Sequence, residues 1–233
     1  MTLVLAHRGS GPFGPEPENT LAAFAAAAEL GADGVELDVR RSRDRQLVVH
    51  HDAFLPDGRP ICETAASELP SSLPSLAEAL DSCAQMIVNV EVKNSPPDPD
   101  VDPGQWVASE TARLLAQRVS AGESLLQSLI VSSFSLGALA AVREAAPGLE
   151  TAWLAGMEEV GSDLVATAQA AGVEGIHPSE WLASDALIEA AHAAGLAVRV
   201  WTVNDAARLA HLGSLGVEAV ITNDVALARQ ALG

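Results

Sequence analysis

Three acidic residues occupy positions where a buried strand would ordinarily carry aliphatic side chains. Glu36 and Asp38 stand two residues apart in the segment 35–39, and Glu91 repeats the pattern in the segment 89–93. Because side chains alternate along a strand with a period of two, the carboxylates of Glu36 and Asp38 share one face. If the two segments are neighbouring parallel strands, all three carboxylates converge where the strands end.

This acidic cluster has two explanations. Arg8 and Lys93 could neutralise it as a buried ion network, which is the ordinary explanation for a single such pair. Three acids against two bases leave one negative charge unbalanced. A hard cation such as Mg²⁺ or Ca²⁺, which prefers oxygen ligands, would balance it. Glu36, Asp38 and Glu91 are therefore candidate metal ligands.

Two histidines accompany these acids. His7 and Arg8 end the first apolar run of the chain, and His51 follows another apolar segment, 46–50. A lone histidine is more often structural than catalytic, but two of them beside carboxylates and two cations form a coherent site for a phosphodiester. Arginine and lysine would bind the phosphate, and the histidines would transfer protons.

The other four histidines are weaker candidates for the site. His50 points away from His51 if the strand continues that far, which favours a structural role. His192 and His211 fall in predicted helices. His177 ends a predicted strand, so we expect that it could reach the rim of the site and contact the substrate.

The elements that must position these residues follow a regular rhythm, in which short β-branched runs alternate with alanine-rich stretches of helical length. The predicted strands are Leu3–Ala6, Gly34–Val39, Met86–Val92, Leu129–Ser133, Thr151–Leu154, Val173–Ile176, Leu196–Val203 and Glu218–Ile221. Eight strands joined by helices predict an α/β protein, a single-domain (β/α)8 TIM barrel over residues 1–233. The three acids and His7 fall at the carboxyl ends of its strands, where active sites of this fold lie.

Helix signals agree with this order of elements. Asn19 or Thr20 can cap a helix that runs to Leu30, and a second helix is predicted over Ser135–Ala146. The segments 46–50 and 53–75 precede the helix at Leu76–Cys83 and lengthen one loop on the catalytic face. The segment 94–103 is rich in proline and aspartate and is predicted to be a loop after the third strand.

Composition excludes several classes of protein. The chain has 31 acidic and 13 basic residues and a net charge of −18, which would repel nucleic acid. Its start lacks a basic leader, and no apolar run reaches about 18 residues, so we expect a cytoplasmic protein without stable membrane association. Cys62 and Cys83 lack the spacing of a metal-binding or redox motif, so we assign them no function.

The sequence contains no motif for a nucleophilic serine, for a phosphate-binding P-loop or for dinucleotide binding.

Taken together, these segments resemble the glycerophosphodiester phosphodiesterase family. The resemblance rests on residues 7–9, 17–20, 34–39 and 48–52, with later similarities at 90–93, 132–134, 200–204 and 221–224. It extends from Leu5 to about Leu227.

The resemblance implies a role for nine residues. His7 and His51 match the acid/base pair, and Glu36, Asp38 and Glu91 match the metal ligands. Arg8 and Lys93 match the phosphate-binding cations, Glu18 matches an acid that orients the first motif, and Trp201 matches an aromatic wall for the glycerol.

The implied reaction is metal-dependent hydrolysis of a small glycerophosphodiester to glycerol 3-phosphate and an alcohol. In one route the glycerol 2-hydroxyl attacks phosphorus and water opens the cyclic ester; direct attack by water fits the same residues. The sequence does not distinguish the acid from the base. It departs from the family after Asp52, and the acidic loop 94–103 could favour a cationic alcohol such as choline or ethanolamine.

Two other functions are compatible with the resemblance. The enzyme could act on lysophospholipids or related phosphodiesters, although the loops are acidic and poor in aromatic residues. Alternatively, the barrel could be inactive and bind a phosphorylated ligand. Such a protein is expected to have lost a histidine or a metal ligand, and none is lost here.

Overall fold

A closed barrel of eight parallel strands organises the chain, described here in a computed structural model for residues 1–9, 16–96, 98–120 and 128–233. The barrel strands are β1 (Leu3–His7), β2 (Gly34–Arg41), β4 (Ile87–Val92), β5 (Ser128–Ser133), β6 (Glu150–Ala155), β7 (Gly175–Pro178), β8 (Ala197–Val200) and β9 (Ala219–Thr222). Each strand pairs with the next in this order, and β1 pairs with both β2 and β9, which closes the sheet. The predicted TIM barrel is confirmed.

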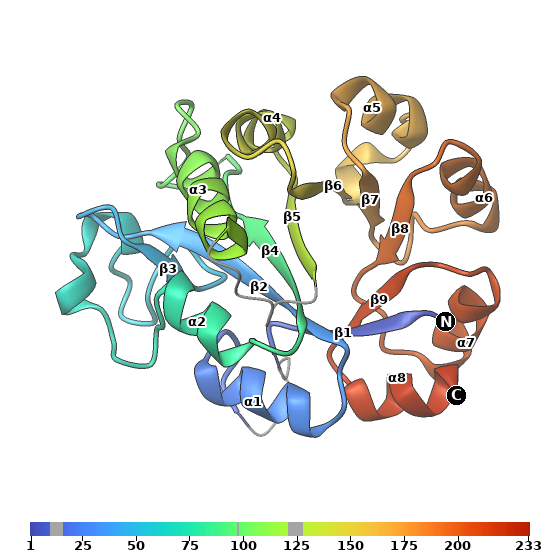
Figure 1. Ribbon diagram of the computed structural model, residues 1–233, viewed down its shortest axis with the longest axis horizontal. Helices are drawn as coiled ribbons and strands as arrows, with labels where there is room; N and C mark the ends of the chain where they lie inside the picture. Colours follow the sequence, from blue (N-terminus) through green and yellow to red (C-terminus); the bar gives the residue numbers. More distant parts are fainter. Residues whose placement is uncertain (10–15, 97, 121–127) are drawn as a thin grey trace.

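Helices surround the barrel as an outer layer (Figure 1). They are α1 (Leu21–Glu29), α2 (Leu76–Ser82), α3 (Trp106–Ser120), α4 (Leu136–Ala145), α5 (Leu164–Ala171), α6 (Asp185–Ala193), α7 (Ala206–Ser214) and α8 (Val225–Leu232). Of the two predicted candidates for the cap of α1, Thr20 fills this position, because its hydroxyl accepts from the Ala23 amide at 3.2 Å. Ser135, predicted as the first residue of the second helix, instead caps α4 by accepting from the Ala138 amide at 3.2 Å.

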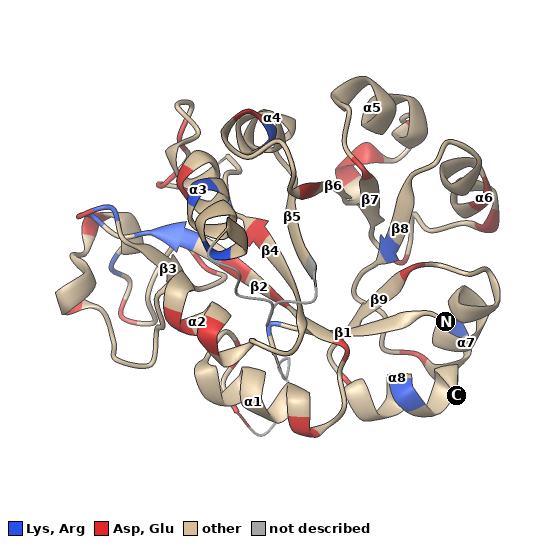
Figure 2. Cartoon of the chain, in the orientation of Figure 1, with Lys and Arg blue, Asp and Glu red and all other residues tan. Residues whose placement is uncertain are grey.

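The outer surface carries the acidic excess of the chain. Figure 2 shows acidic residues on helices and loops around the whole barrel, with fewer basic residues between them. None of the helices in the described part of the chain combines the length and apolar character needed to cross a bilayer.

A ninth strand, β3 (Leu47–Val49), lies outside the barrel and pairs antiparallel with the end of β2. The sequence predicted an extra segment at 46–50 in this place. The pairing of Arg40 with Val48 and of Arg41 with Leu47 extends β2 two residues beyond its predicted end at Val39. Short 3-10 helices η1 (Ile61–Glu63) and η2 (Ala66–Glu68) complete the loop before α2.

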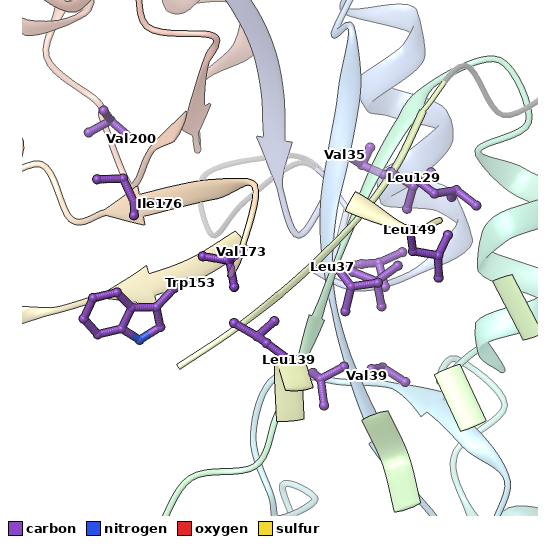
Figure 3. Close-up of a cluster of buried hydrophobic side chains, with 14 of the residues drawn as sticks. Val35, Leu37, Val39, Leu129, Leu139, Leu149, Trp153, Val173, Ile176 and Val200 are labelled. Atoms are coloured by element: carbon purple, nitrogen blue, oxygen red, sulfur yellow. The ribbon is translucent and has the colours of Figure 1, made fainter. Parts of the chain in front are cut away.

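The main hydrophobic core lies between the strands and the helices. Val35, Leu37 and Val39 are fully buried on the outward face of β2, where they meet apolar side chains from other strands and α4 (Figure 3). A separate small cluster around Leu5 and Ile221 fills part of the barrel interior. The alternation that buries these aliphatic residues turns Glu36 and Asp38 inward.

Glycine at the start of β2 permits close approach of the first strands. A Cβ atom on Gly34 would lie 2.3 Å from the Ile87 carbonyl oxygen and 2.7 Å from the Leu5 Cδ2 atom. Any larger side chain would therefore separate β2 from β1 and β4. In the register of this strand pair, Gly34 lies opposite Ile87 and Asp38 lies opposite Glu91.

Two predicted strand boundaries were wrong. The strand predicted at Val173–Ile176 is observed as β7 at Gly175–Pro178, because Val173 instead packs at the end of α5. The strand predicted at Leu196–Val203 ends at Val200, and Trp201 makes only an isolated bridge to Ser179. Apart from the two-residue extension of β2, the remaining predicted strands agree with the observed bounds within one residue at each end.

Away from the acidic cluster, the barrel interior contains a second set of polar side chains, formed by Arg199, Glu150 and His177. An Arg199 guanidinium nitrogen lies 2.7 Å from a carboxylate oxygen of Glu150, the first residue of β6, and another lies 3.4 Å from His177 Nε2. His177 is fully buried. The expectation that it reaches the rim is therefore wrong, because the β7 backbone directs its ring into the barrel beside Arg199.

Candidate active site

The three predicted metal ligands meet at the carboxyl ends of β2 and β4. Asp38 lies directly opposite Glu91 in the strand register, and Glu36 lies opposite Asn89. One carboxylate oxygen from each of Glu36, Asp38 and Glu91 lies within 4.8 Å of the others. All three side chains are buried, so they form one compact set of oxygen donors.

Arg8 and Lys93 are bound to this acidic set. Lys93 Nζ lies 2.7 Å from Glu91 Oε1 and 3.2 Å from Asp38 Oδ1. Arg8 Nε lies 3.4 Å from Asp38 Oδ2, and Arg8 Nη1 lies 2.9 Å from Glu18 Oε1. The ion network considered as the alternative to a metal is thus partly formed, and it is centred on Asp38.

Glu36 is the carboxylate that these cations leave uncompensated. Its Oε2 atom accepts the Arg8 backbone amide at 3.1 Å, but its buried Oε1 atom has no hydrogen-bond partner in the described part of the chain. A buried oxygen without a partner is costly. It is the kind of donor that a bound cation satisfies, so the residues present fit a divalent metal ion.

The pKa directions agree with this distribution of charge. Burial, together with the carboxylates of Asp38 and Glu91, raises the pKa of Glu36 well above its ordinary value. Burial also raises the pKa of Glu91, although Lys93 opposes it. Burial alone would raise the pKa of Asp38 too, but its cationic neighbours, led by Lys93, outweigh burial and lower it. The site holds more carboxylate than its own cations can keep ionised.

His7 ends β1 and faces this cluster. Its Nδ1 atom lies 2.7 Å from Asn223 Oδ1, an acceptor, which assigns the ring proton to Nδ1. Its Nε2 atom, 3.9 Å from Glu36 Oε2, is then the basic nitrogen. Burial and the nearby Arg8 lower the pKa of His7 to about 4, so the ring is neutral at pH 7.

His51 lies two residues after β3 and has a similar arrangement. Its Nδ1 atom lies 2.7 Å from the carboxylate of Asp52, so Nδ1 is the donor and Nε2 can accept or give a proton. Burial lowers the pKa of His51, although Asp38 opposes the shift. Both histidines are therefore oriented through Nδ1 by an oxygen acceptor.

Two cavities are lined by most of the predicted site residues. A small inner cavity of about 20 Å³ is lined by His7, Glu36, Asn89, Glu91, Leu154, Trp201 and Ile221. A larger outer cavity of about 490 Å³ is lined by Arg40, His51, Asp52, Ala53, Phe54, Lys93, Ser95, Pro96, Asp98, Phe134 and Glu158. Of the nine predicted residues, six line a cavity, whereas Arg8, Glu18 and Asp38 join the site through ion pairs.

Trp201 closes one side of the inner cavity. Its indole Nε1 donates to the His177 carbonyl oxygen at 2.6 Å, and its ring meets Phe134 edge to face with centroids 5.5 Å apart. The ring is thus held by β7 on one side and by the end of β5 on the other. Phe134 extends this aromatic wall into the outer cavity.

Asn19 is a site residue to which the sequence assigned only a possible helix cap. It is buried, its amide nitrogen donates to Asp38 Oδ2 at 2.8 Å, and its own backbone amide donates to the Arg8 carbonyl oxygen at 2.9 Å. Arg8 and Asn19 have left-handed φ angles of 55° and 58°, which are uncommon outside glycine and cluster at functional sites. The segment after β1 is therefore shaped to hold Asp38.

Gly9 explains how this segment packs so closely. Its φ is +90°, and a Cβ atom there would lie 2.7 Å from the Ala23 Cβ atom in α1. The glycine thus lets helix α1 approach the backbone beside Arg8.

Arg40 and Asn223 are the other residues missing from the predicted site. Arg40 is 2% exposed, and its Nε atom donates to the His51 carbonyl oxygen at 2.8 Å. Its other nitrogens bind both oxygens of Asp100 at 2.8 Å and one oxygen of Asp98 at 2.9 Å. Arg40 could have been found in the sequence as a charged residue at the end of a predicted strand. Asn223 could have been found as a polar residue shortly after the last predicted strand.

The predicted loop at 94–103 is confirmed for its described residues; Pro97 lies outside them. Asn94 fastens it by donating to the Asp102 carbonyl oxygen at 3.0 Å and accepting from the Asp102 amide at 2.8 Å. Together with Arg40, these bonds place the loop as one wall of the outer cavity.

Comparison with known proteins finds phosphodiesterases that align with nearly the whole chain. A glycerophosphodiester phosphodiesterase of Caldanaerobacter subterraneus subsp. tengcongensis is 29% identical, over 96% of this chain and 94% of the relative. A glycerophosphodiester phosphodiesterase structure from Thermotoga maritima superimposes with a TM-score of 0.76 at 28% identity, over 99% of this chain and 98% of the other.

A phosphodiesterase structure from Oleispira antarctica, in complex with the product sn-glycerol-3-phosphate, superimposes with a TM-score of 0.81 at 25% identity. The alignment covers 100% of this chain and 97% of that one. The profile of the Glycerophosphoryl diester phosphodiesterase family matches residues 7–227. With the barrel and the site in agreement, this match shows that the chain belongs to that enzyme family.

Proposed function

We propose that this protein hydrolyses small glycerophosphodiesters to sn-glycerol 3-phosphate and a free alcohol, with His7 and His51 as the acid/base pair and a divalent cation on Glu36, Asp38 and Glu91. The observation that carries the proposal is the position of two histidines, each oriented through Nδ1, beside three carboxylates, of which Glu36 has a buried oxygen without a hydrogen-bond partner among the described residues.

A divalent cation fits the donor set, because Mg²⁺ and Ca²⁺ take carboxylate oxygens. Bound there, the cation would polarise a phosphoryl oxygen and lower the pKa of a hydroxyl beside it. It would also keep Glu36 ionised. Lys93 and Arg8 then supply the remaining positive charge for the phosphate.

The histidines supply the proton transfers. One Nε2 atom takes the proton of the attacking hydroxyl, from glycerol or from water, and the other protonates the departing alcohol. The ring that acts as base must start neutral, with Nε2 unprotonated, and the ring that acts as acid must start as the imidazolium, with a proton on Nε2. The Nδ1 bonds to Asn223 and Asp52 keep Nε2 as the reactive nitrogen of each ring. Asp52 can also stabilise His51 when the ring becomes charged.

The two cavities suggest where the substrate lies. The inner cavity, at about 20 Å³, has room for little more than one water molecule, so the glycerol portion would lie at its mouth beside Trp201. The outer cavity beside His51, at about 490 Å³, has room for the alcohol portion. Lys93 lines the outer cavity and contacts Glu91 of the inner one, so the phosphate would lie between the two.

The first test is release of sn-glycerol 3-phosphate from glycerophosphocholine by the pure protein, with EDTA and then with Mg²⁺ or Ca²⁺ restored. We expect release that EDTA abolishes and metal restores. Release that survives exhaustive removal of metal would contradict the metal site. Release only from lysophospholipids would replace the substrate class while leaving the site in place.

Metal binding can be tested separately from turnover. Calorimetric titration of Mg²⁺ or Ca²⁺ into the metal-free protein should give one site per chain, and Glu36→Gln should weaken it by about tenfold or more. Glu18→Gln is the matched control, because Glu18 pairs with Arg8 outside the donor set. Equal metal affinity in the wild type and Glu36→Gln would remove Glu36 from the site.

A further inference from the structure

The outer cavity has a wall that the sequence did not assign to the site. Besides His51 and Lys93, it is lined by Phe134, which follows β5, and by Glu158 in the 3-10 helix η3 (Met157–Glu159), which follows β6. At about 490 Å³ it is much larger than the inner cavity of about 20 Å³. It is the part of the site that has room for the alcohol of the substrate.

The charges on this cavity are negative in sum. Three carboxylates line it, on Asp52, Asp98 and Glu158, against two cations, on Arg40 and Lys93. Both cations already have carboxylate partners.

Arg40 lies 2.8 Å from Asp100 and 2.9 Å from Asp98, so its charge is balanced behind the cavity wall. Lys93 lies 2.7 Å from Glu91 and 3.2 Å from Asp38. In the described part of the chain, Glu158 has no ion-pair partner, and its side chain is exposed at the cavity.

Phe134 adds a surface suited to a cation. Its ring lines the outer cavity and is only half-buried, and contact with Trp201 holds it in place. Aromatic rings attract ammonium groups through their quadrupole, and quaternary ammonium ligands are commonly recognised this way. A neutral polyol could donate a hydrogen bond to Glu158 but would lack the ion pair and the contact of a cation with the Phe134 ring, and an anionic alcohol would be repelled.

We propose that the outer cavity selects phosphodiesters whose alcohol carries an ammonium group, and that Glu158 and Phe134 recognise this charge. The inference rests on the proposed hydrolysis of glycerophosphodiesters and adds the class of leaving alcohol. It assigns specificity to the loops after β5 and β6, in addition to the acidic loop after β4.

The test compares two substrates that differ by one charge. Glycerophosphocholine carries a trimethylammonium group, and glycerophospho-3,3-dimethylbutanol carries the uncharged tert-butyl group of the same shape. The ratio of their kcat/KM values isolates recognition of charge, since both share the glycerophosphate and the bulk of the alcohol. We expect the wild type to favour glycerophosphocholine by about tenfold, the range of a partly solvated ion pair with an aromatic contact.

Two variants locate this preference. Glu158→Gln and Phe134→Leu should each lower the ratio several-fold. Glu159→Gln is the matched control in the same 3-10 helix, because the Glu159 carboxylate accepts the Gly156 amide at 2.8 Å and does not line the cavity. It removes the same formal charge and should leave the ratio at the wild-type value.

Each outcome decides between hypotheses. A wild-type ratio near one, or a ratio that Glu158→Gln leaves unchanged, would overturn the inference and leave the hydrolysis standing. An equal fall in Glu158→Gln and Glu159→Gln would assign the effect to overall charge and overturn it as well. No hydrolysis of either substrate by metal-loaded protein would overturn the proposed function together with the inference.

Discussion

His7 and His51 lie in different surroundings but are held in the same way, through Nδ1 and an oxygen acceptor. This orientation leaves Nε2 as the reactive nitrogen of each ring. Replacing either residue by alanine should reduce turnover by about 100-fold or more, the usual contribution of a positioned acid or base. Steady-state kinetics would show the loss, and circular dichroism should show an intact fold. Near-normal turnover in either variant would remove that histidine from the mechanism.

Asn223 provides a finer test at the residue scale. Asn223→Leu deprives His7 of its acceptor at 2.7 Å, so the ring can rotate and change tautomer. We expect kcat to fall by about tenfold or more, as with other partners that orient functional histidines. Thermal unfolding should change little, because Asn223 is only partly buried. A fall in KM with unchanged kcat would argue against an orienting role.

At the scale of elements, Arg40 connects β2 to the two loops that form the outer cavity. It binds the His51 backbone and the nearly buried Asp100. Arg40→Met would leave Asp100 as an uncompensated buried charge and should cost about 3 kcal/mol in the free energy of unfolding. Urea denaturation would measure this loss.

The double variant Arg40→Met/Asp100→Leu separates stability from positioning. Removing both charges should restore much of the stability, because neither is then buried alone. Activity should stay low, because the His51 carbonyl oxygen still lacks its donor from Arg40. Recovery of activity along with stability would show that Arg40 does not position His51.

At the scale of the whole molecule, the buried His177 inside the barrel makes the free energy of unfolding depend on pH. Burial and the neighbouring Arg199 hold the pKa of His177 well below its ordinary value. An unfolded histidine takes up a proton near pH 6.5, but the folded chain keeps His177 neutral. Stability contributed by the neutral ring is therefore complete above about pH 6.5 and is lost as the pH falls toward the lower folded pKa.

Urea denaturation at pH 7 and pH 5 would measure this loss. A single histidine of this kind accounts for about 2 kcal/mol over that interval. His177→Gln should remove that part of the pH dependence, whereas His7 contributes equally to both proteins and cancels in the comparison. Identical pH dependence in the wild type and His177→Gln would contradict the assignment.

The barrel and its acidic centre could be predicted because both depend on local patterns. Alternation along β2 places Val35 and Leu37 outward and Glu36 inward wherever the strand lies. The same period applies to Glu91 in β4. Parallel neighbours then bring the carboxylates together, so Glu36, Asp38 and Glu91 could be grouped from the sequence as candidate ligands.

Strand ends were less predictable, because pairing with other segments decides them. β2 continues to Arg41 only because β3 returns beside it, and β8 stops at Val200 because Trp201 leaves the ladder. His177 was misplaced for a related reason. A two-residue shift of its strand keeps the same face but moves the ring from the rim into the interior.

By itself, the sequence determined the order of the elements, the inward carboxylates and the histidines at strand ends, because periodicity is set by backbone geometry within a few residues. Only the tertiary structure decided that Asn223 holds His7, that Arg40 joins His51 to Asp100, and that Glu158 faces the outer cavity. These partners are far apart in the chain, and their meeting depends on the paths of loops, which follow from packing of the whole barrel rather than from any local pattern.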